Sequence, residues 1–185
     1  LLVISPDQLR EDGLVEPGDC EAWTFPSDRV EFERVIRFKE RLLACAWKRF
    51  RSGARADLRP EFEQFCAEKA ALQKEPALFM ALRAKYQESP FHEWPDGLAR
   101  RERKALEKAR QELVEAIDRF RFGQFILLRH WRMLKDYANR RGIRVLGDLP
   151  IFVSPDSADV WANPELFLLD ERLQPRVVAG VPPDY

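Results

Sequence analysis

Residues 142–170, GIRVLGDLPIFVSPDSADVWANPELFLLD, decide the fold that this chain predicts. Ile143 to Gly147 is a short apolar run that follows a long helical pattern and a glycine, so it predicts a buried β-strand. Asp148 comes directly after this strand, and a loop rich in acids, prolines and Trp161 follows. A strand fixes side chains at its carboxyl end and a loop exposes them, so this order predicts an α/β protein with a ligand site here.

Composition excludes several classes of function. The 185 residues carry 31 Lys plus Arg and 31 Asp plus Glu, for a formal net charge of zero. A neutral chain has no long-range attraction for nucleic acid or an anionic membrane, so we expect neither as a partner. No apolar stretch is long enough to span a bilayer, and no signal peptide is visible.

The cysteines predict no disulfide framework. Cys20, Cys45 and Cys66 are odd in number and form no CxxC pair, and the chain has only two histidines to join them at a metal. Cys45 and Cys66 lie inside helical patterns, so we interpret them as buried free thiols, and we expect a reduced, cytoplasmic compartment.

Several shorter elements precede the long helical pattern. The sequence predicts a strand at 1–5, a short helix at 5–12, a helix from an N-cap at Ser27 to Gly53, a helix from Pro60 that Pro76 interrupts, and a helix at 77–87. Their regular apolar spacing predicts that most of the chain is helical.

The longest helical pattern covers 101–141, with a break expected near Gly123 and a C-cap at Gly142. Its apolar stripe consists of Leu113, Ile117, Phe120, Gln124, Leu127, Trp131, Leu134 and Ala138. His130 lies beside this stripe without an obvious nucleophile as partner, so we expect a surface histidine.

Acidic residues in the final segment have two interpretations each. Asp148 is either a ligand-binding carboxylate at a strand end or a cap for loop amides. Asp156 and Asp159 lie on one face of a helical turn, where they can bind sugar hydroxyl groups or a cation. Alternatively, Asp156 caps a helix N-terminus and Asp159 favours its dipole.

Aromatic residues in the same segment are the other candidates. Trp161 and Phe167 can stack on the apolar face of a pyranose, although such residues more often belong to a core. Tyr185 follows two prolines that hold the loop outward, so it is either a ligand contact or an exposed loop residue.

The series GDLPIFV…DSADVW…ELF…VAGVPPDY closely resembles the 4-α-glucanotransferases of glycoside hydrolase family 77, also called amylomaltases or disproportionating enzymes. The earlier stretches LLVISPDQL, FPSDRVEFERVIRFKERLL and ALFMAL resemble the same family, so the resemblance covers nearly the whole chain.

The resemblance implies a (β/α)₈ barrel with a helical insertion between its second and third strands. Residues 1–9 then end one barrel segment, 10–112 form the insertion, and 113–185 supply a barrel helix, the third strand and an active-site loop. Asp148, Asp156, Trp161, Asp184 and Tyr185 are the expected substrate-binding residues.

The catalytic residues of the family lie outside the resembling segments. The motif of its nucleophilic aspartate, similar to IDHFRG, does not occur here, and the acid/base glutamate and stabilising aspartate come later still. We therefore expect an internal fragment, inactive alone, of an enzyme that acts on α-1,4-glucans, maltooligosaccharides and glucose without an organic cofactor or metal.

Two departures from the family pattern stand out. Leu72 to Pro76 replaces an aromatic-rich run, which puts a second glucan site on the insertion in doubt, and His130 replaces a usual glutamine. An α-amylase-type glucan hydrolase and a non-catalytic helical interaction module remain the alternatives.

Overall fold

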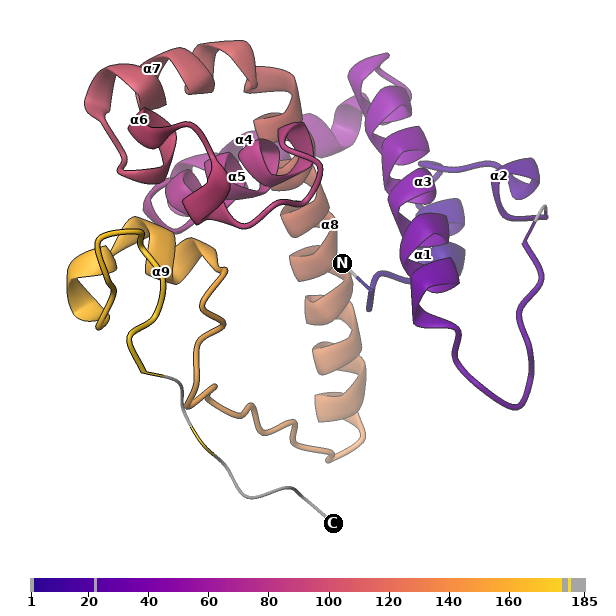
Figure 1. Ribbon diagram of the computed structural model, residues 1–185. Coiled ribbons are helices and arrows are strands. Elements are labelled where there is room, and N and C mark those ends of the chain that lie inside the picture. Colours follow the sequence, from indigo (N-terminus) through magenta and orange to yellow (C-terminus); the bar gives the residue numbers. More distant parts are fainter. Residues whose placement is uncertain (1, 22, 178–179, 181–185) are drawn as a thin grey trace. The chain divides into compact units, whose positions relative to one another are not determined.

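The computed structural model describes residues 2–21, 23–177 and 180 (Figure 1). The elements run α1 (Pro6–Glu11), α2 (Pro17–Glu21), α3 (Phe32–Arg51), η1 (Ala56–Leu58), α4 (Arg59–Glu68), α5 (Ala70–Lys85), η2 (Phe91–Glu93), α6 (Asp96–Ala99), α7 (Arg103–Glu112), α8 (Val114–Arg140), α9 (Ala158–Ala162) and η3 (Pro164–Leu166). The chain divides into two compact units, Leu1–Ala70 with Arg119–Leu146, and Ala71–Asp118 with Gly147–Tyr185.

Local signals set several helix boundaries of unit 1. The Ser5 hydroxyl accepts a hydrogen bond from the Gln8 amide and caps α1, which confirms the helix predicted there. Helix α3 begins only after Glu31, so the N-cap predicted at Ser27 is wrong. Gly53 follows the end of α3 with a φ of +90°, a left-handed conformation that glycine adopts without strain.

An aromatic cluster forms the centre of unit 1. Phe50 of α3 stacks on Phe122 of α8 with ring centroids 4.9 Å apart, and Phe62 of α4 packs edge-on against Phe50 at 5.3 Å. Trp47 and Phe125 complete the cluster from α3 and α8. Offset and edge-on rings add to the apolar burial that joins these three helices.

The inward face of α8 differs from the predicted stripe. Phe122, Phe125 and Ile126 are buried, whereas Trp131 is 43% exposed and Leu134 is also exposed. Ile117 and Ala138 of the predicted stripe are buried as expected. Trp131 and Leu134 are not, because both faces of this part of the helix are apolar and periodicity alone does not select the buried one. The predicted break near Gly123 is also wrong, since the interruption lies at Leu113, between α7 and α8.

His130 is a buried residue, which corrects the prediction of a surface histidine. It follows Ile126 by one helical turn, so it lies on the inward face of α8, and it is 8% exposed. Its Nε2 lies 3.3 Å from Oδ2 of Asp12, which is also buried. The carboxylate gives the imidazole the polar partner that a buried side chain needs.

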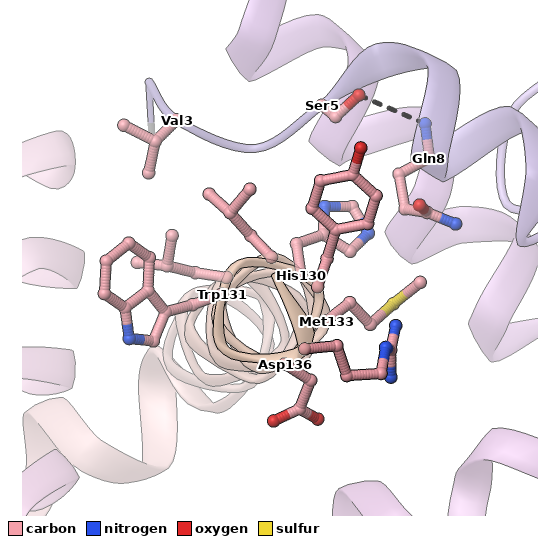
Figure 2. A pocket seen from close by; sticks show the side chains of 11 residues that line it. Val3, Ser5, Gln8, His130, Trp131, Met133 and Asp136 are labelled. Carbon is pink, nitrogen blue, oxygen red and sulfur yellow. Dashed lines mark hydrogen bonds between the residues drawn. The ribbon is translucent and has the colours of Figure 1, made fainter. Parts of the chain in front are cut away.

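A groove of about 740 Å³ runs along the C-terminal half of α8, beside the buried His130. Figure 2 shows Trp131, His130 and Met133 projecting from α8, with Val3, Ser5 and Gln8 across the groove. Leu127, Leu134 and Tyr137 also line it, so its surface is mainly apolar. The groove lies wholly within unit 1.

Unit 2 contains its own aromatic core around α5. Pro76 lies inside α5 and does not interrupt it, contrary to the prediction. A proline in a helix interior removes one backbone hydrogen bond, at a cost of about 3 kcal/mol. Burial of the residues that follow it, Leu78, Phe79 and Leu82 among them, offsets that cost.

The strand predicted at 143–147 is absent from the structure. Residues 143–153 belong to no helix or strand and are all exposed, and an isolated bridge between Leu169 and Pro175 is the β-pairing found among the described residues. The predicted strand at 1–5 is also absent, because residues 2 and 3 form a turn and Ser5 caps α1. A strand needs neighbouring backbone groups to bond to, and these segments have none here.

The domain boundaries expected from the sequence differ from those of the two compact units. The expected boundaries, at 1–9, 10–112 and 113–185, describe parts of a barrel and stay a prediction. No helix in the described part of the chain is both long and apolar enough to cross a membrane. Cys45 and Cys66 are free cysteines, as predicted, but both are half-buried rather than buried.

Candidate active site

The acidic segment after residue 147 contains a short helix with a defined N-terminus. Ser157, in an extended conformation, accepts a hydrogen bond from the Val160 amide at 3.3 Å and caps α9. Asp159 lies in the first turn, where a carboxylate favours the helix dipole. The predicted helix N-terminus is therefore present, but its cap is Ser157 and not Asp156.

Trp161 anchors α9 in the core of unit 2. Its side chain is 0% exposed, and its indole Nε1 donates to the Leu98 carbonyl oxygen at 3.0 Å. The ring packs against Phe79 and Trp94, with centroids 5.8 Å and 5.9 Å away. The guanidinium of Arg101 lies 4.3 Å from the ring centroid, at a distance typical of a cation–π contact. A ring enclosed in this way has no face open to a sugar, so the core interpretation describes Trp161.

Asp156 is held at both carboxylate oxygens. Oδ1 accepts a hydrogen bond from the Phe91 amide at 3.2 Å, and Oδ2 lies 3.4 Å from Nη1 of Arg83. The side chain keeps 26% of its surface exposed. Asp156 therefore presents an oriented carboxylate, with lone pairs available to hydroxyl groups that approach from solvent.

Asp148 is exposed and makes only a local contact among those that the structure describes. Its Oδ1 accepts a hydrogen bond from the next amide, that of Leu149, at 2.8 Å. No described contact brings Asp148 and Asp156 together. Asp184 and Tyr185 lie outside the described residues.

Phe167 and Asp170 shape the segment after α9. Phe167 lines an apolar hollow of about 520 Å³, together with Phe152, Val160 and Leu169. The Asp170 carboxylate accepts hydrogen bonds from the amides of Gln174 and Arg172, and these bonds hold its pKa below the usual range. Asp170 therefore fixes the turn at 170–174.

Sequence reasoning missed two arginines of unit 2. Arg83, in the last turn of α5, pairs with Asp156, and Arg101 connects Trp161 to Glu75, whose Oε2 lies 2.8 Å from Nη2 of Arg101. No local pattern in the sequence predicts these contacts, because each partner lies 26 or more residues away from its arginine. The one available signal was that arginines tend to pair with acidic residues.

The site as described offers positioned hydrogen-bond acceptors rather than bond-breaking groups. No group of three or more His, Cys, Asp or Glu side chains in the described part of the chain is arranged to hold a metal ion. Asp156 presents a fixed hydrogen-bond acceptor, and Pro155, the residue before it, lines the apolar hollow after α9.

Comparisons with known proteins identify the group to which this chain is related. The model of a family described as 4-alpha-glucanotransferase matches residues 1–185. The chain is 43% identical over 180 residues to the 4-alpha-glucanotransferase of Thermus thermophilus, covering 96% of this chain and 35% of that protein. It is 39% identical over 185 residues to the enzyme of Synechocystis sp., covering 99% and 37%.

A solved structure agrees with the sequence comparisons. The amylomaltase from Streptococcus agalactiae in complex with acarbose superposes with a TM-score of 0.88 at 35% identity, over 100% of this chain and 37% of that chain. This chain thus spans about a third of the length of these relatives. Because the family model matches along the whole sequence, the chain belongs to the 4-alpha-glucanotransferase family.

Proposed function

We propose that this chain is part of an enzyme that transfers α-1,4-glucan segments to the 4-hydroxyl of glucose or of another glucan. The observation that carries the proposal is the family match across residues 1–185. The carboxylate hydrogen-bond acceptors around α9 support it, because proteins recognise a sugar through hydrogen bonds to its hydroxyl groups next to an apolar surface.

The proposed mechanism is a retaining double displacement. Two carboxylates about 5–5.5 Å apart act as nucleophile and as acid/base catalyst, and the donor is held covalently between the two steps. These carboxylates and a stabilising aspartate come from polypeptide beyond these residues. Asp148 and Asp156 border the donor sugar, while Asp184 and Tyr185 belong to a loop that excludes water. Trp161 contributes by fixing α9, and no cofactor or metal takes part.

We further propose that the parent enzyme is a (β/α)₈ barrel with this chain supplying an insertion and one helix–strand unit. The apolar outward face of α8, with Trp131, Leu134 and Tyr137, supports this arrangement, because such a face packs against a sheet in α/β folds. The apolar residues at 143–147 then pair as the third barrel strand. We expect a cytoplasmic enzyme of maltodextrin metabolism.

A hybrid enzyme tests the proposal directly. The chain replaces the matching segment of the Thermus thermophilus relative, and the products from maltotriose are separated by chromatography. We expect glucose together with longer maltooligosaccharides from the hybrid, and no reaction from the 185-residue chain alone. Glucose release by the purified chain alone would contradict the assignment of the catalytic acids to other parts of the polypeptide.

The same assay separates transfer from hydrolysis. A transferase conserves the number of glycosidic bonds, so reducing ends do not increase while chain lengths redistribute. A steady rise in reducing ends from a folded hybrid favours the hydrolase alternative. A cooperative melt of this chain without any effect in the hybrid favours a helical interaction module.

A further inference from the structure

The carboxylate of Asp156 is fixed by groups that belong to another part of unit 2. One oxygen accepts from the Phe91 amide at the start of η2, and the other pairs with Arg83 at the end of α5. A carboxylate held at both oxygens loses rotation about its χ2 angle, so the lone pairs left to a ligand point in fixed directions.

Arg83 is itself held in place. Its Nε lies 2.7 Å from Oε2 of Glu88, so its planar guanidinium bridges Glu88 and Asp156. The Glu88 amide in turn donates to the Arg83 carbonyl oxygen at 2.9 Å. Glu88 has a φ of +64°, a left-handed conformation that non-glycine residues rarely adopt, and these contacts stabilise it.

The fold of α9 rests on other contacts. Ser157 caps its N-terminus, and the buried Trp161 binds its C-terminal end to the Leu98 carbonyl oxygen. Removing the Arg83 side chain therefore leaves the anchors of α9 intact and frees the Asp156 carboxylate. This separation distinguishes a role in orienting the carboxylate from a role in folding the segment.

We propose that Arg83 is a positioning residue that orients Asp156 toward the glucan. The inference rests on the proposed function, in which Asp156 borders the donor sugar. In this proposal Arg83 acts through Asp156, since its Nε and Nη1 are directed at the carboxylates of Glu88 and Asp156.

A double-mutant cycle in the hybrid enzyme tests this role. We expect Arg83→Gln to lower kcat/KM for maltotriose about tenfold and Asp156→Asn to lower it at least as much. The double variant should stay within about twofold of Asp156→Asn, because residues that act as a unit are not additive. Arg83→Lys keeps a cation and should recover part of the loss. Arg103→Gln, which removes an exposed arginine paired with Glu107, is the matched control.

Amide hydrogen exchange in the 185-residue chain gives a readout that does not need activity. In Arg83→Gln, the Phe91 amide should exchange about fivefold faster, because its acceptor is no longer held, while the Val160 amide inside α9 stays unchanged. Equal acceleration at both amides indicates a general loss of structure and overturns the positioning role. Unchanged exchange at Phe91 overturns it as well.

The outcomes separate the two proposals. A folded hybrid that leaves maltotriose untouched contradicts the proposed function, and the exchange data then decide whether Arg83 holds Asp156. If the hybrid transfers glucan and the losses of Arg83→Gln and Asp156→Asn multiply in the double variant, the proposed function stands and the positioning role is refuted.

Discussion

Replacement of Trp161 by alanine is the strongest test of the packing around α9. The side chain is fully buried, contacts two aromatic rings and the Arg101 guanidinium, and donates a hydrogen bond to Leu98. Truncating a buried tryptophan to alanine costs about 3–5 kcal/mol of unfolding free energy. For a chain of this size, that loss lowers Tm by about 6–20 °C.

Two further variants serve as controls for the loss of stability expected in Trp161→Ala. Trp161→Phe keeps an apolar ring but leaves the Leu98 carbonyl without its donor, so we expect a loss of about 1–2 kcal/mol. Trp131→Ala removes the same residue type from the exposed face of α8 in the other unit, and should cost less than about 1 kcal/mol.

Urea unfolding followed by far-UV circular dichroism is the suitable assay, because fluorescence changes when a tryptophan is removed. The midpoint and the slope are both recorded, since an unchanged slope shows that only stability has changed. A loss below about 1 kcal/mol for Trp161→Ala, or an equal loss for Trp131→Ala, would refute the reasoning that burial in unit 2 sets the cost.

Further predictions concern single side chains. Asp12→Ala leaves His130 buried without its partner and should cost about 1–3 kcal/mol in a urea melt, whereas His130→Gln keeps a polar partner and should cost less. Pro76→Ala restores a helical N–H in α5 and should raise stability by about 1 kcal/mol, measured by thermal melt; a lower Tm would contradict this. The pKa of Asp170 is depressed from its usual value of 3.8, so its turn is stabilised above that pH and loosens as the pH falls through the lower folded value. The protection of the amides of 172 and 174, taken relative to intrinsic exchange at each pH, should fall with it, and Asp170→Asn should remove this pH dependence of protection. Burial, together with Asp19, raises the pKa of the Cys45 thiol, so Cys45 should alkylate more slowly than N-acetylcysteine at pH 8. Mass spectrometry measures the two rates, and they should become equal when the chain is unfolded in urea.

Sequence reasoning predicted those parts of the fold that depend on neighbouring residues. Ser5 caps α1, and Gly53 and Gly142 follow helix ends with positive φ, because these preferences act within one turn of helix. The strand expected at 143–147 failed, since its hydrogen-bond partners must come from distant chain. Pro76 also misled the prediction, because burial of the following residues outweighs its local cost.

In the candidate site, too, local features were predictable from the sequence and contacts between distant residues were not. The helix N-terminus near residue 157 was predictable from its short polar residues, although Ser157 rather than Asp156 proved to be the cap. The pairing of Asp156 with Arg83 was not predictable, because the two residues lie 73 positions apart in the sequence and no local pattern connects them. Burial of His130 likewise depends on Asp12, which lies 118 residues earlier.

The bare apolar segment after α8 has a consequence for handling the isolated chain. Leu146 is 92% exposed and Ile151 is 88% exposed, so this segment favours self-association and chaperone capture during expression. Pro150 and Pro155 bracket the most apolar part, and proline interrupts the continuous backbone pairing on which amyloid growth depends. Aggregates formed through this segment should therefore be amorphous and dissolve on dilution, rather than convert into fibrils.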